Sequence, residues 1–165
     1  MNMRTEKIGK ELVFEDIRDK IVKFLETHHT IVLATALDNR VTIRTVTYAT
    51  KGLEVCYMSF GHHKKIKQIE KNSRVALCKD NVNIEGVAEI LGSPLDEKNR
   101  EYAEIYKKKL PRDYAGFAHV PRMVMVKVTP KFIVSMVRIE KKLHLEHLDL
   151  ENKRAYLKKL QDETY

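Results

Sequence analysis

The stretch HKKIKQIEKNSRVAL, residues 63–77, predicts a short helix followed directly by a buried strand. Two isoleucines fall on one face of a helix over Lys64–Lys71, which ends at Asn72. A run of apolar residues then predicts a strand over Arg74–Lys79. Two lysines at the start of a helix oppose its dipole, so this position favours an anionic ligand. A solvated lysine-rich face is the alternative.

Upstream of this stretch, the pattern predicts a helix and three neighbouring strands. Apolar residues recur at helical spacing over residues 14–26. Runs rich in β-branched residues over 31–37 and 41–48 flank a two-residue Asp-Asn turn and predict a β-hairpin. A third strand over 53–59 follows another short turn. Strands joined in this way form an antiparallel meander.

Downstream, the chain alternates again between strands and helices. The predicted elements are a strand over residues 82–91, a helix that starts with Ser93 as its N-cap and ends before Pro111, strands over 122–128 and 131–137, and a helix over 149–161. The expected fold class is mainly β with α elements: an antiparallel barrel of six to seven strands with inserted helices. We expect a single domain over residues 1–165, with its core at about 14–137 and a helical C-terminal tail over 140–165.

Composition excludes several classes of protein. The 165 residues include 31 Lys or Arg and 23 Asp or Glu, a formal net charge of +8, and the 43% hydrophobic share is ordinary for a globular protein. No apolar run approaches the roughly 18 to 20 residues of a membrane-spanning helix. The two cysteines cannot form a disulfide framework or a zinc site alone. We therefore expect a cytoplasmic protein with no metal site and no membrane association.

Positive charge is concentrated in and around residues 63–77. Residues 60–80 hold six Lys or Arg and two acidic residues. The glycine spacing fits neither a Walker loop nor a dinucleotide fingerprint, so cationic side chains would have to bind any phosphate. Arg44 lies within a Val, Ile and Thr run that should be largely covered, and a buried arginine requires an anionic partner. An exposed arginine that pairs across strands is the alternative.

Together these features resemble the pyridoxamine-phosphate-oxidase-like, FMN-binding split-barrel family. The resemblance rests on Arg44-Thr45-Val46 in the hairpin, Tyr57-Met58-Ser59 at the end of the third strand, residues 63–77, and residues 81–86. It covers roughly residues 14–137. It implies a split barrel that acts as a homodimer and binds FMN at the subunit interface.

The resemblance also implies which residues bind the cofactor. Arg44 and Lys65 would bind the FMN phosphate, with Lys64 beside them. Backbone groups after Arg44 would face the edge of the flavin ring, two residues of the third strand would contact the ring and ribityl chain, and an asparagine would reach the pyrimidine edge. His63 stands where a small hydroxyl residue is common. The implied set is Arg44, Thr45, Val46, Thr47, Met58, Ser59, His63, Lys64, Lys65 and Asn81.

Two departures from the family concern the substrate. True pyridoxamine-phosphate oxidases carry a substrate lysine five residues after the arginine, where this chain has Ala49. They also carry a C-terminal tryptophan and an Arg-x-His pattern, whereas this chain has no Trp and its tail over residues 141–165 lacks that pattern. Oxidation of pyridoxamine phosphate is therefore not expected.

The function expected from the resemblance is redox chemistry with FMN. An oxidoreductase or flavin reductase with a nicotinamide donor fits, although no catalytic residue or small-molecule substrate can be assigned. One alternative is the same fold with haem or deazaflavin, because His62 and His63 border the phosphate site. The other is a basic nucleic-acid-binding barrel without redox activity, which the lack of an aromatic-rich strand disfavours. His144 and His147 are expected to be surface histidines.

Overall fold

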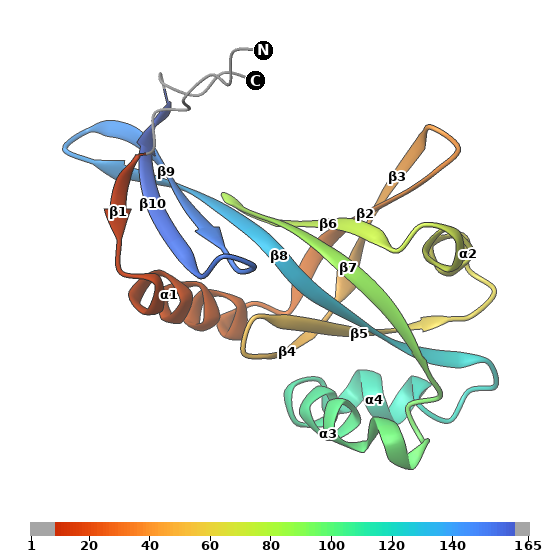
Figure 1. Cartoon of the computed structure of the whole chain (residues 1–165). Coiled ribbons are helices and arrows are strands. Elements are labelled where there is room, and N and C mark those ends of the chain that lie inside the picture. The colour runs from red at the N-terminus through yellow and green to blue at the C-terminus, as the bar shows by residue number, and fades with distance from the viewer. Residues whose placement is uncertain (1–8, 161–165) are drawn as a thin grey trace.

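The computed structural model describes residues 9–160, which form one ten-stranded antiparallel sheet with inserted helices (Figure 1). The strands are β1 Lys10–Leu12, β2 Thr30–Leu37, β3 Arg40–Thr47, β4 Ala49–Lys51, β5 Glu54–Phe60, β6 Arg74–Lys79, β7 Val82–Gly92, β8 Met123–Ile139, β9 Lys142–Asp149 and β10 Arg154–Lys159. The helices are α1 Phe14–Thr27, α2 Lys64–Lys71, the 3-10 turn η1 Glu97–Asn99, α3 Arg100–Lys109 and α4 Pro111–Phe117.

The sheet curls into a barrel that its hydrogen bonds do not close. The strand order is β1-β10-β9-β8-β7-β6-β2-β3, and β5 pairs with β8 and with β4. The long strand β8 is central, because β5, β7 and β9 all pair with it. β3 ends the hydrogen-bonded path and is therefore an edge strand. This arrangement confirms the predicted fold class, a mainly β split barrel with inserted helices.

The helix and strand predictions in the first half of the chain are confirmed. α2 and β6 have the predicted bounds, and α1 extends one residue beyond its predicted end. Ile17, Ile21 and Leu25 form the buried stripe of α1. The strand count differs, because β1, β4 and the two C-terminal strands bring the six to seven expected strands to ten.

The helical C-terminal tail predicted over residues 140–165 is wrong for its described part. β9 and β10 form an antiparallel hairpin there, and β1 pairs with the outer edge of β10. The leucine spacing fits a helix, but pairing with β8 on one side and β1 on the other makes the extended form favourable. Residues 161–165 of the predicted tail lie outside the described residues. His147 is also buried, with its ring stacked on Tyr156 at 4.7 Å, and is not the surface histidine expected.

Two predictions between residues 93 and 137 need correction. Ser93 does not cap the long helix: its hydroxyl accepts a hydrogen bond from the Leu95 amide, and α3 begins only at Arg100. Pro111 ends α3 but also starts α4 as its first residue, a position that suits proline. The strands expected on either side of Thr129-Pro130 are one strand, β8, in which a bulge opposite Gly86 accommodates the proline.

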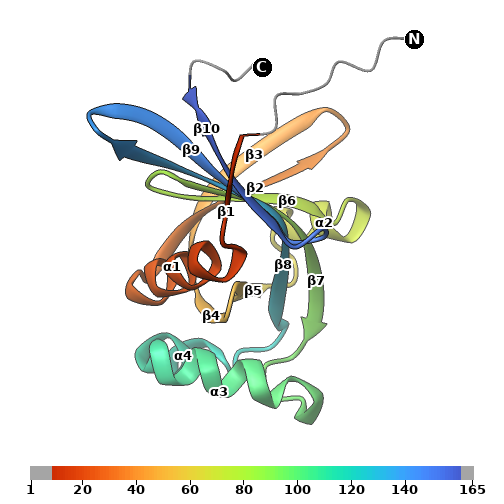
Figure 2. The same cartoon turned by 60° about the vertical axis from the view of Figure 1, so that its left-hand side comes forward.

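The helices cover different parts of the barrel. The main core cluster joins α1 and α2 to the inner faces of the strands. A second cluster joins α3 to β4 and β5, and Figure 2 shows α3 and α4 beneath these strands. Among residues 9–160, no helix is long and apolar enough to cross a membrane. The site described next lies between α2 on one side and the α3–α4 pair on the other.

Candidate functional site

Arg44 projects from β3 on the same face as the buried residues Val46 and Tyr48. Its guanidinium donates to the hydroxyl oxygens of Thr35, at 2.6 Å, and Thr42, at 2.5 Å. Both hydroxyls in turn donate to Oε1 of Gln68 on α2, at 2.7 and 2.8 Å. Neutral groups thus orient the guanidinium, and no carboxylate among residues 9–160 forms an ion pair with it.

Lys65 brings a second positive charge to Arg44. Burial lowers the pKa of its ammonium group, and the charge of Arg44 lowers that pKa further. Burial also lowers the pKa of the Arg44 guanidinium. In the described part of the chain, Lys65 has no acidic partner, and its Nζ lies 3.2 Å from Nδ1 of His63. Arg44, His63 and Lys65 are hereafter called the cation cluster. Arg44 and Lys65 are half-buried and His63 is exposed, and none of the three forms an ion pair with an acidic residue among residues 9–160.

His63 joins this cluster as the N-cap residue of α2. Its side chain makes no capping hydrogen bond, and the first turn of the helix contains no acidic residue. Burial, Lys65 and His62 lower the pKa of the His63 imidazole. The helix therefore begins with cationic side chains beside its free N–H groups, an arrangement that favours an anion.

Tyr57 contributes a buried hydroxyl near the same charges. Its side chain is fully buried on β5, and the hydroxyl has no hydrogen-bond partner among residues 9–160. Burial raises the pKa of the phenol, and the charge of Arg44 opposes this rise. An unsatisfied buried hydroxyl costs free energy. The barrel interior next to Arg44 thus retains unused hydrogen-bonding capacity.

A cavity of about 190 Å³ opens beside the cation cluster, between β5, α2 and the α3–α4 pair. Five of the residues predicted from the sequence line it: Thr47, Met58, Ser59, His63 and Lys65. The structure therefore brings together residues from β3, β5 and α2 that are up to 18 positions apart in the chain.

The other five predicted residues, Arg44 among them, do not line this cavity. Thr45 is exposed on the opposite face of β3 from Arg44, Val46 is buried in the core, and Lys64 is exposed. Because β3 is an edge strand, backbone groups along its outer edge are left without ladder partners. Asn81 lies in the β6–β7 turn, where its side-chain amide donates to the carbonyl of Met136. Within one chain, Asn81 is not part of the cavity.

Three cavity residues come from the helical insertion and were missed by the sequence analysis. Tyr106, Asp113 and Phe117 line the wall opposite α2. The Tyr106 hydroxyl lies 2.9 Å from the Thr47 hydroxyl and attaches α3 to β3. Pro111 is the feature of the sequence that could have indicated α4, because proline favours the first position of a helix as well as ending the preceding one.

A sequence model of the family described as "Pyridoxamine 5′-phosphate oxidase" matches residues 17–135. The chain belongs to this family. The match spans the barrel from α1 to β8 and includes every cavity-lining residue. No curated protein matches the chain.

Solved structures share the fold at low sequence identity. General stress protein 26 of Bacillus anthracis is 22% identical over 71% of this chain and 91% of its own, with a TM-score of 0.53. An FAD-binding protein of Mesorhizobium loti is 17% identical over 69% and 89%, with a TM-score of 0.57. The haem storage protein HutZ of Vibrio cholerae is 13% identical over 68% and 88%, with a TM-score of 0.59. At this identity, the likeness establishes the split-barrel fold.

Ala49 is the position at which the sequence predicts a departure from the true pyridoxamine-phosphate oxidases. Its side chain is fully buried in β4, opposite Cys56, within the second core cluster. A charged substrate-binding side chain at this position would have to displace apolar neighbours.

Proposed function

We propose that the protein is an FMN-binding flavoprotein whose cation cluster holds the phosphate of the cofactor. The observation that carries this proposal is the closeness of Arg44 to Lys65, neither of which forms an ion pair with a carboxylate among residues 9–160. Bringing two cations together at a half-buried site is unfavourable unless an anion joins them. A phosphate monoester carries nearly two negative charges, and an arginine fork with a lysine point charge matches it.

The size and lining of the cavity fit one end of FMN. Sites for whole cofactors measure about 300–1,000 Å³, so a cavity of about 190 Å³ accommodates the phosphate end and part of the chain that follows. Thr47, Met58 and Ser59 line the same cavity next to Lys65. The flavin ring would then lie along the free edge of β3. When bound, FMN supplies a ring that accepts and donates electrons, while this chain binds and orients it.

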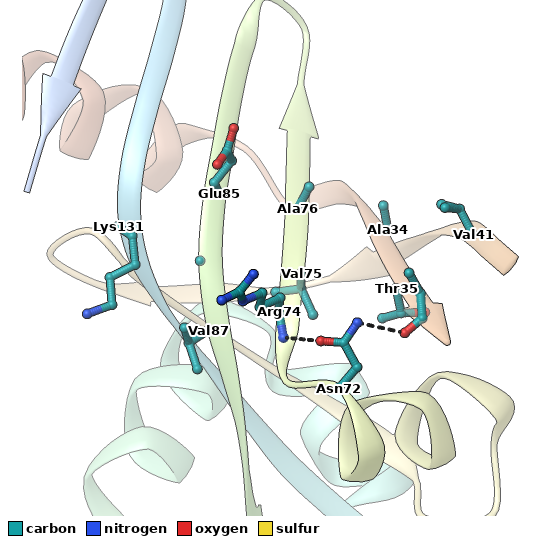
Figure 3. Close-up of a pocket in the computed structure, with 12 residues that line it drawn as sticks. Ala34, Thr35, Val41, Asn72, Arg74, Val75, Ala76, Glu85, Val87 and Lys131 are labelled. Carbon is teal, nitrogen blue, oxygen red and sulfur yellow. Dashed lines mark hydrogen bonds between the residues drawn. The ribbon is translucent and has the colours of Figure 1, made fainter. Parts of the chain in front are cut away.

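A second copy of the chain would complete the site. The outer face of β2, β3, β6 and β7 carries a hollow of about 450 Å³ (Figure 3). Its lining includes small apolar residues, Val41 and Val87, and also the polar side chains of Thr35, Asn72 and Lys131. Arg74 and Glu85 lie in this hollow, and among the described residues neither forms an ion pair. A two-fold interface through this hollow would allow Arg74 of each protomer to pair with Glu85 of the partner subunit. We therefore propose a homodimer with FMN between its subunits.

The proposed reaction is flavin reduction by a nicotinamide donor, in the cytoplasm. Pyridoxamine phosphate is not expected to be a substrate, because Ala49 provides no cation for its phosphate. Anaerobic bleaching of the flavin absorbance with each donor in turn tests this assignment. Fast bleaching by pyridoxamine phosphate would contradict it.

Haem is the second candidate ligand, and an aromatic group next to the cation cluster favours it. The Phe60 ring contacts His62 and His63, with centroids 5.5 and 5.1 Å apart, and meets Phe117 edge-on at 6.4 Å. Imidazoles can bind iron, and the nearby cations could bind carboxylate groups of haem.

Parallel titrations of the purified protein with FMN, riboflavin and haemin distinguish these ligands. We expect tight FMN binding, seen as quenching of flavin fluorescence, with riboflavin bound at least ten-fold more weakly because it lacks the phosphate. A Soret band that shifts and saturates at one haem per chain, without FMN binding, would favour the second candidate. Equal affinity for FMN and riboflavin would contradict the proposed phosphate site.

A further inference from the structure

Gln68 is a polar residue of α2 that is buried together with two isoleucines. Its side chain is only 3% exposed, whereas Ile66 and Ile69 beside it pack into the main core cluster. Burial of an amide costs free energy unless its polar atoms form hydrogen bonds. The Oε1 atom of Gln68 accepts two of them, from Thr35 at 2.7 Å and from Thr42 at 2.8 Å. The buried oxygen of α2 is therefore committed to the hairpin that carries Arg44.

The hydrogen bonds among these residues can run in one direction only. A guanidinium donates hydrogen bonds and accepts none, so the hydroxyls of Thr35 and Thr42 accept from Arg44. Each hydroxyl then has its own proton to donate, and Oε1 of Gln68 accepts both protons. An amide NH2 group in the place of this oxygen would leave both protons without that acceptor. The chain of hydrogen bonds thus starts at the charge of Arg44 and ends at a neutral amide.

The neutral end of this chain determines whether the charge of Arg44 is compensated. A glutamate has the shape of a glutamine, and its carboxylate oxygens would accept hydrogen bonds from both hydroxyls equally well. Its negative charge, however, would lie one hydroxyl away from the guanidinium, in a buried region where charges interact strongly. Arg44 would then have a counter-charge from its own chain, and a phosphate would gain less by binding beside it.

We propose that Gln68 is a positioning residue for anion binding, because its amide fixes the Arg44 guanidinium through two threonines without neutralising it. This inference rests on the proposed function, in which the anion is the phosphate of FMN. It assigns part of the affinity for that phosphate to a residue that does not line the cavity of about 190 Å³. It also implies that the ligand-free protein would be more stable with a carboxylate at this position.

Two variants of α2 that change the net charge by the same amount test the proposal. Gln68→Glu places a carboxylate at the end of the hydrogen-bond chain, and Lys67→Gln removes a positive charge at the neighbouring position. Lys67 is the matched control, because its side chain is 61% exposed and pairs with Glu70 of the same helix. FMN and riboflavin binding by fluorescence quenching, and thermal unfolding without ligand, are measured in slightly alkaline buffer, where the new carboxyl group is ionised.

The expected effects of Gln68→Glu on binding and on stability have opposite signs. It should bind FMN at least ten-fold more weakly than the wild type and leave riboflavin binding unchanged, because only FMN carries a phosphate. Without ligand, it should unfold at a higher temperature than the wild type. Lys67→Gln should change the ratio of the two flavin affinities by less than about two-fold, since solvent screens an exposed charge.

A merely structural role of Gln68 would give a different result. Damage to the fold by Gln68→Glu would weaken the binding of both flavins and lower the unfolding temperature. Either of these results, or unchanged FMN binding, would overturn the proposal.

A second variant keeps the proposal testable if the buried glutamate prevents folding. Gln68→Met has a similar length, removes the acceptor and adds no charge. It should lower the affinity for FMN, and less so than a carboxylate, because Arg44 keeps its charge but loses its fixed orientation. The affinity for riboflavin should again stay unchanged. FMN binding by Gln68→Met that equals that of the wild type would contradict the positioning role.

Failure of the proposed function would be seen separately, as a wild-type protein that does not bind FMN. Inorganic phosphate then replaces FMN as the probe, and the rise in unfolding temperature that it causes is measured. This rise should be smaller in Gln68→Glu than in the wild type and in Lys67→Gln. The same rise in all three proteins would show that Gln68 does not control the charge of Arg44.

Discussion

Arg44 is held by two threonine hydroxyls, and this choice of neutral partners leaves its charge available to a ligand. A carboxylate at the same distance would fix the side chain equally well but would also neutralise it. The hydroxyls are fixed in turn by Gln68 of α2, so one helix positions both Lys65 and, through the threonines, Arg44. At the scale of single residues, the site is a set of cationic side chains positioned to bind an anion.

The first prediction concerns the phosphate contact of Arg44. Replacing Arg44 with Ala should weaken FMN binding by about ten-fold to a hundred-fold, since a charged hydrogen bond contributes about 1.5–3 kcal/mol. Riboflavin binding should change much less. Fluorescence quenching with both flavins measures the two losses. Lys67→Ala is the control, because Lys67 is exposed on α2 and pairs with Glu70. Equal losses for the two flavins would show that Arg44 does not bind the phosphate.

The second prediction concerns pH. Because the folded-state pKa of Lys65 is lowered, the unfolded chain binds more protons at this residue just below its usual pKa of 10.5. In the ligand-free protein, the lowered pKa of Lys65 therefore reduces the free energy of unfolding at neutral pH. That free energy increases again as the pH rises from the lowered pKa towards 10.5. Lys65→Met should be more stable than the wild type near neutral pH, and this gap should shrink as pH rises.

Saturating phosphate or FMN should reverse the order of the two proteins. An anion beside Lys65 favours its charged form, so the wild type should gain more stability from the ligand than Lys65→Met. Thermal unfolding over a pH series, with and without ligand, gives both comparisons. A difference in stability between the wild type and Lys65→Met that does not change with pH would contradict this explanation.

At the scale of elements, the β7–β8 bulge shows how the barrel bends next to its centre. Gly86 pairs with Pro130, and Lys131 is the extra residue. A Cβ at Gly86 would lie 2.8 Å from the Thr129 carbonyl oxygen, closer than a side chain can approach. Glycine at this position lets two strands approach closely.

Alanine substitutions at two glycines should therefore have opposite effects. Gly86→Ala should destabilise the protein by about 1–3 kcal/mol through this clash. Gly116→Ala should stabilise it by about 0.5–1 kcal/mol, because Gly116 lies in α4 with open space around it and alanine favours helix. Chemical denaturation measures both values. A Gly86→Ala variant as stable as the wild type would mean that the strands separate more easily than the packing implies.

At the scale of the whole molecule, one face of the barrel exposes large apolar side chains. Ile43 and Val41 on the edge strand β3 are 70% and 65% exposed, next to the hollow that also contains Arg74 and Glu85. Exposed apolar side chains gathered on one face favour an interaction site. The asparagine expected at the flavin ring lies outside the cavity of its own chain, which is consistent with a site completed by another copy.

The proposed dimerisation through this face predicts the effect of a single charge. Ile43→Arg should convert a species of twice 19.3 kDa into one of 19.3 kDa in sedimentation velocity, because an unpaired charge would be buried at the interface. It should also weaken FMN binding. Leu95→Arg, at an exposed apolar residue between β7 and η1, should leave both unchanged. A wild-type monomer that binds FMN tightly would contradict the dimeric site.

Elements whose pattern is local could be predicted from the sequence. The apolar stripe of α1, the bounds of α2 and the strand that follows it depend on residue spacing within one element, and they match the structure. The resemblance carried by Arg44 and Lys65 also identified residues that the fold brings together. These predictions succeed because helical and strand periodicities are properties of neighbouring residues.

Features that depend on partners distant in the sequence could not be predicted from it, because they arise only in the tertiary structure. The C-terminal stretch has a helical spacing of leucines, yet pairing with β1 and β8 makes it a hairpin. The hydroxyls that hold Arg44 come from β2 and β3, and Asp113 reaches the cavity only because α3 is anchored by Tyr106. Residue spacing carries no information about such contacts, since their energy arises only when the strands and helices of the barrel pack together.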